Sequence, residues 1–191
     1  IQIIRSGDVI PHIRNIITPA EQPLMPTVDY IWNDSRVDIM LENKNEDEGV
    51  RNRNIIGFFN GIEVDRLGDK NVIKIIGAGF DTIPKILKMT KEQFLSIDGF
   101  KEKMANNIHI GIKTQIEKAT ISKIMSSSNR FGRGFGDRKI ELILTEYPDI
   151  LTSNESETIK IEKLSKVNGM AKKTAEIFVK QVPQFLDFLR D

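Results

Sequence analysis

The sequence predicts a mainly α-helical chain that begins with a short β-rich stretch. Three observations carry this prediction. Apolar residues recur at helical spacing from about residue 55 onward, the first 17 residues have an extended pattern, and one short glycine-containing motif recurs four times. With 191 residues, of which 39% are hydrophobic and 29% charged, the chain has enough apolar side chains to bury a core.

Composition excludes several classes of protein. The chain has no cysteine, which excludes disulfides, thiolate nucleophiles and cysteine-ligated zinc. His12 and His109 are the only histidines, and no acidic pattern around them indicates a metal site. No apolar run approaches the roughly 18 residues of a membrane helix, so we expect no membrane partner. Because the chain opens without methionine or a signal peptide, we interpret it as a fragment of a longer protein.

The first 17 residues are predicted to be extended, and the next ten to form a linker. Ile1–Ile4 has the pattern of a strand, Ser6–Asp8 that of a turn, and Val9–Ile13 that of a second strand with a proline suited to an edge. Two strands do not form a stable sheet alone, so we expect their partners upstream. Three prolines within Thr18–Thr27 indicate a linker.

The following segment is less regular, and helices are expected after it. Val28–Trp32 and Arg36–Leu41 are predicted as short strands, and the polar Asn43–Asn54 as a loop. Helical stripes follow, and Thr90 with Gln93 three residues later predicts a capping box at a helix start. Helix starts or breaks are expected at Pro84, Pro148 and Pro183.

The repeated motif is seven residues long and aligns four times without gaps. Its copies are Val64–Lys70, Ile97–Lys103, Gly132–Arg138 and Val167–Lys173. The third positions are Arg66, Gly99, Gly134 and Gly169, at intervals of 33, 35 and 35 residues. Each copy has an apolar fourth residue and precedes a helical pattern. The motif therefore predicts four units in which one helix ends, the chain turns sharply and a second helix begins.

Such a unit has a predictable chemistry. Glycine in the turn tolerates positive φ, and the apolar residue packs between the two helices. The first amides of the second helix lack partners within the helix and lie at the positive end of its dipole, so they suit a phosphate oxygen. Lysine or arginine just inside that helix adds full charge, and residues 61–191 hold 22 basic and 18 acidic side chains. Amides contact phosphate rather than bases, so binding is expected to be largely independent of sequence.

These motifs identify the candidate DNA-binding residues. They are Arg66, Leu67, Gly68, Lys70, Gly99, Phe100, Lys101, Lys103, Arg133, Gly134, Phe135, Gly136, Arg138, Lys139, Gly169, Met170, Ala171, Lys172 and Lys173. The third copy has both glycines. The first copy has Arg66 in place of the first glycine, and the second and fourth copies lack the second glycine, so some units are expected to be structural only.

The four copies resemble tandem helix-hairpin-helix motifs, and the whole arrangement resembles the C-terminal half of NAD-dependent DNA ligases. Arg5–Pro11 resembles the end of the OB-fold in that family, Met25–Thr27 the segment before its zinc finger, and Gly61–Lys70 the entry to its first hairpin. The resemblance implies an OB-fold remnant with a linker over 1–27, a zinc-finger-like connector over 28–57 and a helix-hairpin-helix domain over 58–191.

The sequence departs from this family in the connector. The family's finger uses four cysteines and this chain has none, so we expect no zinc and infer that Tyr30, Trp32 and Ile39 hold the segment by packing. A degenerate finger suits a viral member of the family.

The resemblance also implies a role in a larger enzyme. In the family an upstream nucleotidyltransferase domain uses NAD and Mg²⁺ to seal nicks, and its Lys-x-Asp-Gly motif is absent here. The fragment alone is therefore expected to be non-catalytic and without a cofactor. Its expected partners are nicked double-stranded DNA and that upstream domain, inside the cell at sites of replication or repair.

Two alternatives stay open from the sequence. The chain fits a tandem helix-hairpin-helix module of a repair nuclease or junction-binding protein. It also fits a helical protein-interaction scaffold in which the glycines serve packing alone.

Overall fold

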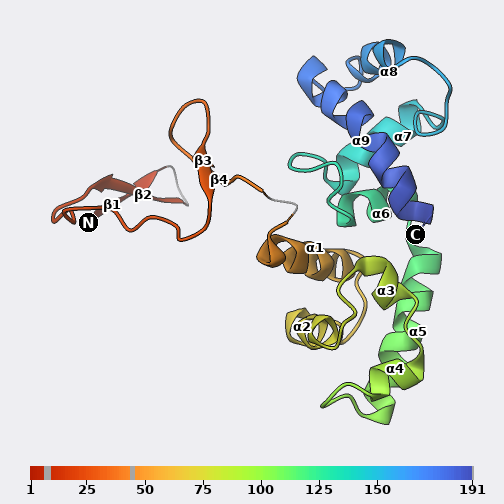
Figure 1. The fold of residues 1–191 in the computed structure, drawn as a ribbon. Helices are drawn as coiled ribbons and strands as arrows, with labels where there is room; N and C mark the ends of the chain where they lie inside the picture. Colours follow the sequence, from red (N-terminus) through yellow and green to blue (C-terminus); the bar gives the residue numbers. More distant parts are fainter. Residues whose placement is uncertain (7–9, 44–45, 191) are drawn as a thin grey trace. The chain divides into compact units, whose positions relative to one another are not determined.

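The chain divides into two compact units, residues 1–44 and 45–191, in a computed structural model that describes residues 1–6, 10–43 and 46–190 (Figure 1). The N-terminal unit holds the strands and the C-terminal unit holds the helices. The mainly α-helical fold predicted from the sequence is confirmed. No helix in the described ranges is long and apolar enough to cross a membrane.

The first two strands form an antiparallel pair, as the sequence predicted. β1 (Gln2–Ser6) pairs with β2 (Ile10–Asn15), and Ile3 lies opposite Ile13. Both of these isoleucines are more than half exposed, so the pair has little core of its own. Most of the turn expected at 6–8 lies outside the described residues.

The segment between the proline-rich linker and the helical part of the chain forms a small hairpin. β3 (Tyr30–Trp32) pairs with β4 (Ile39–Leu41), so that Trp32 lies opposite Ile39. The turn is held by the Asn33 side-chain oxygen, which accepts from the amides of Val37 and Asp38 at 3.0 and 3.2 Å. Tyr30 and Trp32 contact edge to face, with ring centroids 6.5 Å apart, but the Trp32 side chain stays 47% exposed. Hydrogen bonds in the turn therefore stabilise this hairpin in addition to the expected packing of Tyr30, Trp32 and Ile39.

The predicted loop over 43–54 is wrong from residue 48 onward. α1 (Glu48–Gly61) begins there, and its N-cap Asp47 accepts from the Val50 amide at 2.8 Å. The first turns of α1 are polar, and its buried residues Ile55, Phe58 and Phe59 come later, which hid the helix from the apolar pattern. The connector predicted over 28–57 thus runs across the boundary between the two units.

Eight further helices follow in the described residues, and all but α3 belong with α1 to four pairs. They are α2 (Asp69–Gly77), α3 (Ile83–Leu87), α4 (Lys91–Leu95), α5 (Glu102–Lys118), α6 (Ile121–Ser127), α7 (Asp137–Glu146), α8 (Glu157–Leu164) and α9 (Lys172–Arg190). We call α1–α2, α4–α5, α6–α7 and α8–α9 the first to fourth hairpins; the helices of each pair contact one another. The capping box of Thr90 and Gln93 is confirmed at the start of α4.

The core of the helical unit is rich in aromatic side chains. The Phe178 ring of α9 stacks on Phe131 at 4.8 Å between centroids, and Phe188 meets Phe58 of α1 at 5.8 Å. Pro183, expected to start or break a helix, instead lies inside α9. Because α9 buries apolar side chains both before and after Pro183, its packing outweighs the roughly 3 kcal/mol that an internal proline costs.

Candidate nucleic-acid interface

The four turns share one backbone conformation at their third residue. Its φ is 63° at Arg66, 82° at Gly99, 95° at Gly134 and 73° at Gly169. This left-handed conformation costs a non-glycine residue about 1–2 kcal/mol, which explains glycine at three of the four positions. The first hairpin has the same turn although it carries arginine, so the absence of glycine there does not mark a different structure.

The apolar fourth residue of each motif is buried. Leu67 is fully buried, and Phe100, Phe135 and Met170 are each 5% exposed. The four side chains are therefore buried, as packing between the two helices requires. The consequence is that these four candidate residues offer a ligand their main chain and not their side chain.

The fifth residue of each motif precedes the second helix directly. Gly68, Lys101 and Gly136 are the N-caps of α2, α5 and α7, and no side chain caps these helices. In the fourth hairpin the Ala171 carbonyl accepts from the amides of residues 174 and 175, as an N-cap residue does. Within the described part of the chain, the amides of the fifth, sixth and seventh motif residues have no hydrogen-bond partner in any of the four copies. Each turn thus presents three consecutive free donors.

The charge beside these amides differs between hairpins. The sixth motif residue is Asp69, Glu102 or Asp137 in the first three copies and Lys172 in the fourth. A carboxylate at the first helical position stabilises the helix dipole but repels a phosphate from the same amides. The net charge of the seven-residue motif is 0, 0, +1 and +2 in chain order. These acidic residues lower the expected affinity of the first three turns for phosphate, an effect that the prediction from the sequence did not include.

The candidate cations are available for a ligand. The seventh residues, Lys70, Lys103, Arg138 and Lys173, are all exposed. So are Lys101, Arg133 and Lys172, whereas Lys139 is partly buried. Among the described residues none of these eight side chains forms an ion pair, and Arg66 pairs only with its exposed neighbour Asp65 at 3.4 Å.

Specific contacts connect the hairpins. Lys74 of α2 donates to the Asp98 carbonyl in the second turn at 3.3 Å, which joins the first and second hairpins. Phe131 and Phe135 of the third hairpin pack on Phe178 of the fourth. Helices α1 and α6 contact one another and so join the first hairpin to the third. The repeat is therefore one packed unit rather than four independent modules.

The histidine that lies in the helical unit has a structural role. The His109 ring Nδ1 lies 3.1 Å from the Met89 carbonyl and is partly buried. No group of three acidic or histidine side chains suited to a metal ion occurs in the ranges that the structure describes.

Comparison with known proteins agrees with this geometry. Residues 62–114, which hold the first two turns, match a family described as "SAM-like Helix-hairpin-helix tandem". The whole chain is 37% identical over 192 aligned residues to 30% of a DNA ligase of Acanthamoeba polyphaga mimivirus.

Two further relatives extend this similarity. The putative DNA ligase 052L of Invertebrate iridescent virus 3 is 30% identical over 91% of this chain and 21% of its own length. A DNA ligase of Shewanella baltica is 26% identical over 94% of this chain and 28% of its own length. The chain thus spans less than a third of these relatives. The resemblance to the C-terminal helix-hairpin-helix region of a DNA ligase, viral ligases included, is confirmed.

Proposed function

We propose that this chain is the DNA-binding part of an NAD-dependent DNA ligase and that it holds nicked duplex DNA through backbone amides and basic side chains. One observation carries the proposal. Four turns with the same left-handed φ at their third residue each have three amides without a hydrogen-bond partner at the start of a helix. Such amides bind phosphate oxygens without reading bases, as a ligase that seals nicks of any sequence requires.

The proposed contribution to catalysis is positional. An upstream nucleotidyltransferase domain of the same protein, with NAD and Mg²⁺, supplies the chemistry of nick sealing. This chain holds the two ends of the nick in register, so that the reaction proceeds within one complex. It acts inside the cell, where DNA is replicated or repaired.

Titration of the chain against nicked and intact duplexes at several salt concentrations tests the proposal. We expect binding that weakens steeply with salt and that is similar for duplexes of different sequence. No binding at low salt, or binding insensitive to salt, contradicts it. A strong preference for a four-way junction over a nicked duplex favours the nuclease or junction-binding alternative.

A second experiment addresses the scaffold alternative. Gly134 and Gly136 of the third turn face open space, where an added Cβ meets nothing within 4 Å. Changing Gly136, whose φ is negative, to valine adds a branched side chain at the residue that bears the first free amide, without backbone strain. An unchanged affinity for DNA in a folded Gly136→Val variant favours the scaffold.

A further inference from the structure

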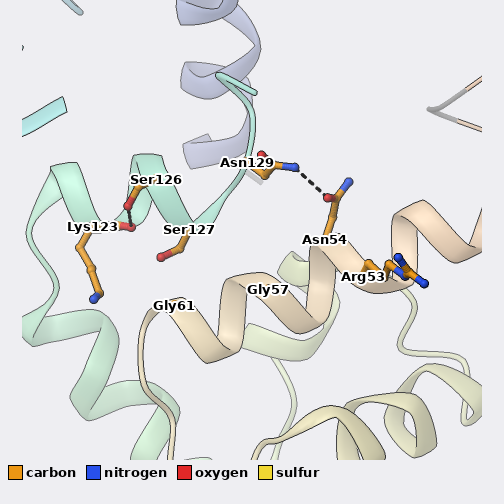
Figure 2. Close-up of a pocket in the computed structure, with 8 residues that line it drawn as sticks. All are labelled: Arg53, Asn54, Gly57, Gly61, Lys123, Ser126, Ser127 and Asn129. Carbon is orange, nitrogen blue, oxygen red and sulfur yellow. Dashed lines mark hydrogen bonds between the residues drawn. The ribbon is translucent and has the colours of Figure 1, made fainter. Parts of the chain in front are cut away.

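A polar cleft of about 370 Å³ lies between α1 and α6, and none of its lining residues belongs to the four turn motifs (Figure 2). It forms where the first helices of the first and third hairpins pack together. Asn129 donates to the Asn54 side-chain oxygen at 3.0 Å and joins the two sides. None of the residues that line this cleft is among the candidate DNA-binding residues, although Gly61 begins the segment that resembles the entry to the first hairpin.

Two glycines one helical turn apart form its floor on α1. Gly61 is explained by packing, because a Cβ there would lie 2.8 Å from the Ser127 Cβ of α6. Gly57 is not, because a Cβ at that position meets nothing within 4 Å. Glycine is unfavourable in the middle of a helix, so helix stability opposes it as well. Gly57 leaves the cleft open.

The cleft has the charge of an anion site. Its lining includes two cations, Arg53 and Lys123, and no carboxylate. Arg53 forms no ion pair with any described residue. Lys123 forms an ion pair with Glu63, to whose carboxylate it donates at 3.0 Å, so Arg53 is the unpaired cation of the lining and Lys123 offers only its remaining ammonium protons. Figure 2 shows Lys123 at one end of the glycine floor and Arg53 at the other. The Ser127 side chain lies near Gly61.

We infer that this cleft is a phosphate-binding site, distinct from the hairpin turns, that takes the phosphodiester backbone of a bound DNA strand. Residues 53 and 61 are eight positions apart on α1, or about 12 Å along the helix, which is longer than a single phosphate. A cleft of this length, with the unpaired Arg53 at one end, suits an extended anionic chain. The identification of the strand as DNA rests on the proposed function, whereas the oxyanion chemistry of the cleft does not. Free phosphate shares that chemistry.

Charge-removing and cleft-filling variants test the inference. Arg53→Gln removes the unpaired cation, and Arg51→Gln is its matched control, because Arg51 is exposed on the same helix but does not line the cleft. Gly57→Leu fills the cleft, and its thermal unfolding checks that the variant folds. The first readout is affinity for nicked duplex as a function of salt. The second is a titration with inorganic phosphate, followed by the amide NMR signals of Gly57, Gly61 and Ser127.

We expect Arg53→Gln to weaken duplex binding about three- to tenfold and to reduce the salt slope by about 1. Gly57→Leu should weaken binding comparably, and Arg51→Gln should have little effect. In another outcome, inorganic phosphate causes saturable shifts that Arg53→Gln abolishes, while the duplex affinity of Arg53→Gln is unchanged. That outcome supports the oxyanion site, with free phosphate as its ligand.

The inference is overturned if Arg53→Gln and Gly57→Leu leave both readouts at the level of Arg51→Gln. If the unaltered chain still binds the duplex and Lys172→Gln/Lys173→Gln lowers that affinity, the proposed function survives this result. If the unaltered chain fails to bind any duplex, the proposed function fails, and the phosphate titration alone decides the cleft.

Discussion

Charge removal at the fourth hairpin is predicted to weaken DNA binding more than the same change at the second. Lys172 and Lys173 occupy the first two positions of α9, both exposed and with no carboxylate in their motif. If each contacts one phosphate, their loss reduces the slope of log affinity against log salt by about 1.8, at about 0.9 per contact. Between 50 and 200 mM salt, the unaltered chain should then lose about 12-fold more affinity than Lys172→Gln/Lys173→Gln.

The matched comparison is Lys101→Gln/Lys103→Gln. It removes the same charge from a motif in which Glu102 lies between the two lysines, and we expect a smaller change in slope. Fluorescence anisotropy with a nicked duplex at three salt concentrations measures both variants. The helix dipole disfavours lysine at the start of α9, so Lys172→Gln/Lys173→Gln should not lower Tm. Equal slopes for the two double variants, or a change in sequence preference, would refute the ranking of the hairpins by charge.

Four further predictions concern single residues. Glu102→Gln removes a negative charge beside free amides and releases Lys91 from its ion pair with that carboxylate, so duplex affinity should rise severalfold in the same anisotropy assay while Tm falls by about 1–3 °C. Arg66→Gly relieves the left-handed conformation and should stabilise the fold by about 0.5–1 kcal/mol in denaturant unfolding; a loss of stability contradicts this. Phe178→Ala empties a fully buried site and should cost about 3–5 kcal/mol, read as a shift of the urea midpoint at constant slope. Because Lys85 donates to Asp81, the pKa of that carboxyl is lowered. Its contribution to stability is present at neutral pH and is lost as the pH falls from the unfolded pKa through the lower folded pKa, so Asp81→Asn should reduce Tm more at pH 7 than at pH 3.

The repeat was predictable because its signal is local. The turn requires positive φ at one position and a buried apolar residue at the next, and both requirements limit the residue types. The first turn shows the limit of that reasoning. Arg66 departs from the glycine pattern, yet the turn keeps its conformation. Leu67 is buried, and the Asn71 side chain donates to the Arg66 carbonyl at 2.7 Å.

Other features depend on tertiary contacts that no local pattern contains. The start of α1 is polar, and its N-cap Asp47 lies among other charged residues, so the pattern there does not differ from that of a loop. The cleft between α1 and α6 joins Asn54 to Asn129, which are 75 positions apart in the chain. Only the packing of α6 on α1 brings them together, so no local sequence pattern groups these two residues.

The fourth hairpin differs from the others in a way that folding alone does not explain. An acidic residue at the first helical position favours the helix, and three of the hairpins have one. The fourth has two lysines there, where the dipole disfavours them and where none of the described carboxylates pairs with them. A local arrangement that opposes stability without a packing gain is expected where a ligand needs it. Since the free amides and both lysines favour the same anion, phosphate accounts for the fourth hairpin more simply than packing does.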